Sequence, residues 1–179
     1  GYAPSNLPGT LEEVREISKI YDDCDTLTGE HANEKIIKDM SASGKLAEYD
    51  IVHFATHGLS HQEIPELSAL VLSLNDTTVE DGYLRMEEIA DLKFNARFAN
   101  LSACETGLGK IYNGEGMVGL THAFLLAGCD GLCVSLWQVD DKATKTFMTT
   151  MYRIAKEQQV PFYEAITLTK RKFIHGEFG

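Results

Sequence analysis

Cysteine and proline are both scarce in this chain, which has only four of each among its 179 residues. Four scattered cysteines are too few for the disulfide framework of a small secreted domain, so most of them are expected to be free thiols. No apolar run approaches the roughly 20 residues that a bilayer span needs. The first ten residues also lack the basic and apolar segments of a secretory signal. We therefore expect no membrane association and a cytoplasmic location.

The chain also has fewer basic than acidic residues. It contains 16 Lys and Arg against 27 Asp and Glu, which gives a net charge of -11. A surface of this sign repels phosphates, which argues against direct binding of nucleic acid. It would attract a protein segment rich in Lys or Arg, although acidity that merely keeps a domain soluble explains the same charge.

The residues that are present indicate one globular domain over residues 1–179. Hydrophobic residues make up 44% of the chain and charged residues 24%. A chain of this length can bury a core without disulfides or metals. It contains no repeat, low-complexity tract or Pro/Ser-rich linker.

Helix and strand patterns alternate along the chain. Thr10 and Glu13 have the spacing of a capping box before a helix over residues 11–21, and a second helix is expected after Asn33. Three apolar runs lack the polar alternation of a strand with one wet face, which indicates buried strands. They span residues 50–58, 97–107 and 128–141.

The segments between these strands predict a hairpin and a helix. Residues 68–90 hold two strand-like runs that flank an Asn-Asp-rich turn and Asp81-Gly82, which indicate an inserted β-hairpin before a short helix. The next helix is expected to be capped by Asn113, to end at Gly128 and to bury one apolar stripe. That stripe consists of Met117, Leu120, Phe124 and Leu125.

Two more helices are predicted over residues 141–158 and 161–174, the second with Pro161 in its first turn. A strand, helix, strand order of this kind indicates an α/β fold with a mostly parallel central sheet and helices on both faces.

His57 and Cys104 are the candidate catalytic residues, because both follow strands whose carboxyl ends form the ligand-binding edge of such a sheet. The 47 positions between them accommodate the hairpin and a crossover helix, so their strands can be neighbours. An imidazole beside a thiol can take its proton, and the thiolate then attacks a carbonyl. The backbone amides of Gly58 and Cys104 would hold the oxyanion. From spacing alone, an inert apolar Cys104 explains the pattern more often.

Five motifs favour catalysis: LPGTLEEV (7–14), HFATHG (53–58), LSACETGLG (101–109), GEGMVGLTHAFLLAG (114–128) and SLWQVDDKAT (135–144). Together they resemble the CHAT domains, relatives of caspases and separases. The resemblance runs in register over nearly the whole chain and implies a caspase-like three-layer α/β/α sandwich. It also implies a cysteine endopeptidase that cuts a protein partner, with His57 as general base and Cys104 as nucleophile.

The same resemblance leads us to expect that the chain is trimmed at both ends. Because CHAT domains commonly follow helical repeats, a regulatory helical-repeat region or an activator protein is an expected partner. We hypothesise that the glycine-rich segment over residues 105–116 is disordered or misplaced until such a regulator orders it. An ordinary connection beside the site is an equally good interpretation.

The substrate pocket is less clearly marked. Separases, which the chain resembles at Leu-Trp-x-Val-x-Asp, favour a basic residue before the cut bond, so Asp140 and Asp141 suggest an acidic pocket. The N-cap of a helix explains Asp140 without any substrate. Trp137 and Glu105 are the other candidates for substrate binding, although Trp137 also suits a core position.

We expect no metal and no cofactor. On a strand, His53 and His57 would lie about 13 Å apart, which is too far to share an ion. Cys129 and Cys133 have a zinc-like interval but no second ligand pair, so core thiols are expected. The glycines over residues 107–116 lack the spacing of a phosphate-binding loop. The remaining histidines, for which no partner can be identified, are expected to be structural or exposed: His53, His61, His122 and His175.

Two other functions stay open at this point. One is a catalytically silent caspase-like scaffold or binding module in a signalling or defence complex, although the presence of both His57 and Cys104 argues against it. The other is a different thiol hydrolase, such as an esterase or a transpeptidase, that uses the same pair of residues.

Overall fold

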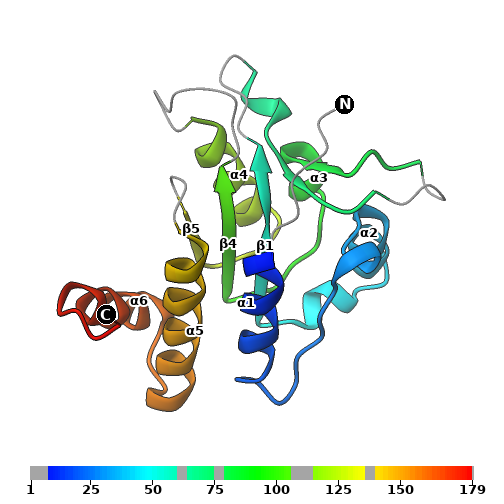
Figure 1. Ribbon diagram of the computed structural model, residues 1–179. Helices are drawn as coiled ribbons and strands as arrows, with labels where there is room; N and C mark the ends of the chain where they lie inside the picture. Colours follow the sequence, from blue (N-terminus) through cyan, green and yellow to red (C-terminus); the bar gives the residue numbers. More distant parts are fainter. Residues whose placement is uncertain (1–7, 60–63, 75–78, 106–114, 136–139, 179) are drawn as a thin grey trace. The chain divides into compact units, whose positions relative to one another are not determined.

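The structure is a computed structural model, shown in Figure 1, which describes residues 8–59, 64–74, 79–105, 115–135 and 140–178. The chain forms two compact units. The first is built from the described parts of Leu27–Gln138, and the second from those of Ser5–Thr26 and Val139–Gly179.

The first unit contains a mixed sheet, in which the described residues form five strands in the order β3-β2-β1-β4-β5. β1 is parallel to β4, and β4 is parallel to β5. The hairpin of β2 and β3 is antiparallel and is attached to β1. Strands at the three expected places, the inserted hairpin and the α/β class are thereby confirmed, and the arrangement is that of a caspase-like fold. The expected burial on both faces is wrong for most of β1 and for β5, which are half-buried. The strands are β1 Ile51–Leu59, β2 Ala69–Val71, β3 Tyr83–Arg85, β4 Phe98–Glu105 and β5 Leu132–Val134.

Helices of the first unit begin where local chemistry favours them. α2, over Glu34–Ala42, starts after Asn33, whose side-chain oxygen accepts a hydrogen bond from the Ile36 amide at 2.9 Å. This N-cap satisfies a backbone amide that the helix itself leaves without a partner, so the expected helix start is confirmed. The other helical elements are α3 Met86–Ala90, α4 Glu115–Leu126 and the short 3-10 helices η1 Gly29–His31, η2 Lys45–Glu48 and η3 Pro65–Leu67.

The core of this unit lies between the sheet and α4. Phe124 of α4 is fully buried and contacts the rings of Phe54 and Phe94, at centroid distances of 5.4 and 5.6 Å. The predicted stripe is correct for Leu120 and Phe124 but wrong for Leu125, which is 47% exposed. One residue turns a helix by about 100°, which carries Leu125 off the buried side.

Gly128 ends α4, as expected from the sequence. The Gly128 amide donates a hydrogen bond to the Leu125 carbonyl, and the Cys129 amide donates one to the Phe124 carbonyl. These are the two hydrogen bonds of a Schellman motif. Gly128 has φ +103°, and a Cβ built there would lie 2.4 Å from the Phe94 carbonyl oxygen. Only glycine therefore fits this turn without strain.

The second unit is a group of three helices: α1 Pro8–Ser18, α5 Asp141–Gln158 and α6 Phe162–Ile174. The capping box at Thr10 is wrong, because α1 already begins at Pro8, a residue suited to a first helical turn. Lys145 of α5 pairs with Glu12 of α1 at 2.7 Å.

Aromatic rings add to the contacts of the second unit. The ring of Tyr152 meets those of Tyr21 and Phe162 edge to face, at centroid distances of 6.1 and 5.6 Å. Across the described residues, no helix combines the length and the apolar character that a membrane span requires.

Candidate active site

The candidate site lies where β1 and β4 run side by side to their carboxyl ends (Figure 1). The two strands pair in parallel over eight residues, and in this register His57 is opposite Cys104 and Gly58 is opposite Glu105. Neighbouring strands lie about 4.8 Å apart. The backbone therefore brings the two candidate catalytic positions together at the edge that was expected from the sequence.

A constant separation of 47 residues marks this register along the two strands. At its start, the guanidinium of Arg97 pairs with the carboxylate of Asp50 at 3.1 Å. Farther along, the side chains of His53 and Asn100 are hydrogen-bonded. Both pairs are 47 positions apart, as are His57 and Cys104.

His53 has a partner that could not be identified from the sequence. Its Nδ1 lies 2.9 Å from Nδ2 of Asn100, which is fully buried. This contact fits the structural role that was one of the two expected for His53. Along a strand, side chains alternate between the two faces of the sheet. His53 and His57 are four positions apart, as are Asn100 and Cys104, so this alternation assigns the pair 53–100 and the pair 57–104 to the same face. Ala99 and Leu101, of opposite parity, belong to the core with α4.

His57 is enclosed by strands on both sides. It is opposite Cys104 in β4 and opposite Val71 in β2, and only 5% of its surface is exposed. The hydroxyl of the preceding residue, Thr56, donates to the Val71 carbonyl. Gly58 is buried as well and is opposite Leu70. The end of β1 is thus fixed by backbone pairing with two neighbours.

Replacing Asn100 with Leu tests how much the buried pair contributes to the two central strands. The variant keeps a similar volume but takes the Asn100 amide from His53, which we expect to lower the free energy of unfolding by about 1–3 kcal/mol. Arg97→Met is the control, because its exposed ion pair with Asp50 is worth less than about 1 kcal/mol. Urea unfolding measures both, and an equal loss in the two variants would contradict the importance of the buried pair.

Comparison with known proteins identifies the family. A family model described as "CHAT domain" matches residues 1–177, nearly the whole chain. The chain belongs to the CHAT domain family. This agrees with the resemblance carried by the five motifs and with the caspase-like fold.

Curated relatives of this CHAT domain are much longer proteins. The chain is 29% identical to tetratricopeptide repeat protein 28 of Mus musculus and 27% identical to its Homo sapiens counterpart, each over 182 aligned residues. In both cases the match covers 82% of this chain but only 7% of the relative. The chain therefore spans a small part of proteins that are named for their helical repeats.

The structure describes three of the four candidate substrate-binding residues. Asp140 is the N-cap of α5, and its carboxylate accepts a hydrogen bond from the Ala143 amide at 3.0 Å, which is the capping role considered above. Asp141 is the first residue of α5. Glu105 is the last residue of β4, opposite Gly58. Trp137 and most of the glycine-rich segment, residues 106–114, lie outside the described residues.

The other cysteines differ in their surroundings. Cys24 is exposed, Cys133 is half-buried and Cys129 is buried. Burial, together with the charge of Asp130, raises the pKa of Cys129 to about 11. A thiol with this pKa is almost entirely protonated at neutral pH and is unreactive. Cys129 is therefore a core thiol, as expected.

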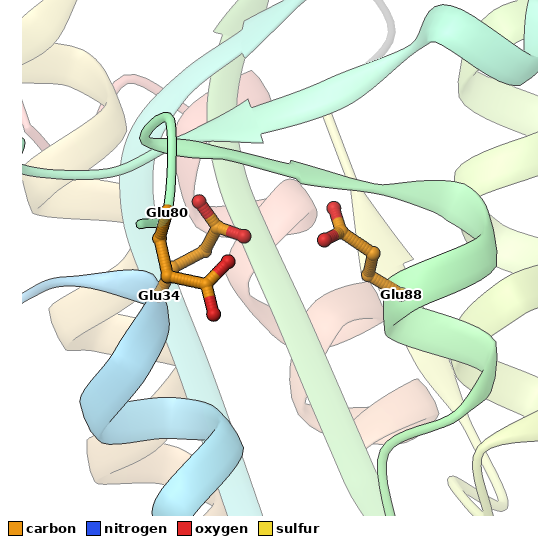
Figure 2. A group of neighbouring side chains, drawn as sticks. All are labelled: Glu34, Glu80 and Glu88. Carbon is orange, nitrogen blue, oxygen red and sulfur yellow. The ribbon is translucent and has the colours of Figure 1, made fainter. Parts of the chain in front are cut away.

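One group of titratable residues was not found from the sequence. Figure 2 shows the carboxylates of Glu34, Glu80 and Glu88 converging from α2, from the segment before β3 and from α3. One oxygen of each lies within 4.8 Å of the others. Sequence spacing does not reveal this group, because Glu80 and Glu88 are distant from Glu34 in the chain. The spacing indicates only that Glu34 can pair with Lys38, four residues later on α2.

Proposed function

We propose that this CHAT domain is a cysteine endopeptidase that cleaves a protein partner, with His57 as general base and Cys104 as nucleophile. The observation that carries the proposal is the register of β1 and β4, in which position 57 is opposite position 104 at the carboxyl ends of two parallel strands. Ligands of parallel sheets bind at this edge.

The chemistry follows from the two side chains. The imidazole of His57 takes the proton of the Cys104 thiol, and the thiolate attacks the carbonyl carbon of the peptide bond. Backbone amides of Gly58 and Cys104 hold the negative oxygen that forms. The bond to nitrogen then breaks as the imidazolium protonates the leaving amine. Water, deprotonated by His57, finally hydrolyses the thioester and regenerates the thiol.

The wider setting of the activity is part of the same proposal. Since the curated relatives are tetratricopeptide repeat proteins, a helical-repeat region or a separate activator is the regulator that we propose. The cytoplasm is the proposed compartment, where the catalytic thiol stays reduced.

Selective alkylation tests the chemistry of the dyad. At pH 6, an ordinary thiol of pKa about 8.5 is ionised to only ~0.3%, whereas a thiol that has given its proton to an imidazole is a reactive thiolate. We expect iodoacetamide to label Cys104 at least about tenfold faster than the exposed Cys24. Desolvation and the carboxylates of Asp25 and Asp23 raise the pKa of Cys24, so it is a suitable reference. Peptide mass spectrometry measures both rates.

His57→Ala is the matched control for the alkylation experiment. Without the imidazole, labelling of Cys104 should slow to the rate of Cys24, and cleavage of peptides with Arg, Leu or Asp before the cut bond should stop. Equal labelling of both thiols in the unaltered chain would refute the dyad and favour the silent scaffold. Fast labelling with ester hydrolysis but no peptide cleavage would instead indicate another thiol hydrolase.

A further inference from the structure

The three carboxylates that Figure 2 shows all form ion pairs with one ammonium group, that of Lys38. Nζ of Lys38 lies 2.9 Å from Glu34, 2.7 Å from Glu80 and 2.7 Å from Glu88. We call these four residues the Lys38 cluster. Three carboxylates at this spacing repel one another unless a cation lies among them, and Lys38 supplies that cation.

Protonation in the Lys38 cluster reflects two opposed effects. Burial raises the pKa of Glu34 more than the hydrogen bond from Lys38 lowers it. Burial would likewise lower the pKa of Lys38, but hydrogen bonds to the three carboxylates outweigh it and raise that pKa. The ammonium group is therefore charged at neutral pH and available to all three partners.

The Lys38 cluster connects α2 to both sides of the β2–β3 hairpin. The second carboxylate oxygen of the buried Glu34 accepts a hydrogen bond from the Gly82 amide at 2.9 Å, just before β3. The Gly82 carbonyl accepts from the Leu72 amide at 2.8 Å, just after β2. The Ser73 amide donates to the Ala32 carbonyl at 2.9 Å, beside the start of α2.

Among the described residues, the backbone pairing of the hairpin with β1 lies at the proposed catalytic end. β2 pairs with β1 at three positions, which begin at His57 and end at Leu59. The Thr56 hydroxyl adds a bond to the carbonyl of Val71, the residue opposite His57. Contacts thus run without interruption from Lys38 to the proposed base.

We propose that Lys38 and Glu34 are positioning residues, which set the place of His57 relative to Cys104 by holding the β2–β3 hairpin against α2. The inference rests on the proposed endopeptidase function. A buried ion pair adds little to stability compared with apolar residues of the same size, because desolvation offsets its attraction. Precise placement of a reacting group, by contrast, is worth large factors in rate. We therefore expect the cluster to matter more for catalysis than for stability.

Lys38→Met tests the proposal, with Lys35→Met as its matched control. Lys35 lies on the same helix and pairs at 2.6 Å with Asp39, but that pair is exposed and joins two residues of α2 itself. Hydrogen exchange followed by mass spectrometry reports on local opening without any need for activity. In Lys38→Met, we expect amides 57–59 and 69–71 to exchange about tenfold faster, while amides 98–101 change less than about twofold. Lys35→Met should change neither set.

Steady-state cleavage supplies the second measurement. We expect Lys38→Met to lower kcat about tenfold with KM within about twofold, because the base is misplaced while the substrate still binds. Lys38→Arg, which keeps the charge and its hydrogen bonds, should restore most of kcat. If Lys38→Met does not fold, Glu80→Gln removes a single half-buried carboxylate and should show the same pattern more weakly.

Three results would overturn the inference. One is unchanged exchange at residues 57–59, and another is an equal rise over residues 98–101, which would indicate general destabilisation. The third is a fall in kcat that Lys38→Arg does not reverse. If the unaltered chain cleaves no peptide or protein, the endopeptidase proposal fails, whereas hydrogen exchange still shows whether the Lys38 cluster fixes the end of β1.

Discussion

If the proposed endopeptidase function holds, Cys104→Ala is expected to reduce cleavage of a protein partner by about 10⁴-fold, because the variant has no atom that can form the proposed thioester. His57→Ala should cost a similar factor. The double variant should be hardly worse than either single variant, since the two side chains act as one unit and their losses do not add. Mass spectrometry of the new amino termini that appear in a lysate measures the cleavage.

Cys24→Ala is the control for this loss, because Cys24 is exposed and belongs to the second unit. Its activity should match that of the unaltered chain, and thermal unfolding of both variants should begin at the same temperature. Retention of more than about a tenth of the activity in Cys104→Ala would show that another residue is the nucleophile.

Gly128→Ala is expected to lower the free energy of unfolding by about 2–4 kcal/mol, the largest stability change predicted for this chain. Two costs combine at this position. A side chain at φ +103° strains the backbone, and its Cβ would lie 2.4 Å from the Phe94 carbonyl oxygen. Since that oxygen is part of the backbone, the end of α4 or the segment before β4 must move.

Gly44→Ala separates these two costs. Gly44 also has a positive φ, +84°, but a Cβ there would meet nothing within 4 Å. The control should therefore lose only about 1–2 kcal/mol, the cost of the backbone conformation alone. Urea unfolding of both variants measures the difference, and equal losses would show that the approach of Phe94 to Gly128 relaxes without cost.

The approximate places of the strands follow from runs of residues that do not depend on distant contacts. The lack of polar alternation in residues 50–58 and 97–107 predicts parallel strands there, and the structure has β1 over Ile51–Leu59 and β4 over Phe98–Glu105. The hairpin was predictable from Asp81-Gly82, where Gly82 has φ +80°. From these features, the approximate place of His57 and Cys104 follows.

Contacts between distant residues were not predictable in the same way. No local pattern pairs His53 with Asn100, because the hydrogen bond depends on a register that only the folded sheet defines. Lys38 likewise meets Glu80 and Glu88 only after the hairpin packs against α2. The start of α1 was misplaced because Thr10 and Glu13 match a capping box equally well when both lie inside the helix.

The second unit combines a helix from before the sheet with two helices from after it, so its parts are synthesised at different times. Within this domain, α1 is translated before the sheet. Lys145, which pairs with Glu12 of α1, and Tyr152, which contacts Tyr21 just after α1, belong to α5 and are translated only after the entire sheet. A helix of 11 residues is marginal in water on its own. We therefore expect α1 to stay largely unfolded until α5 has been synthesised.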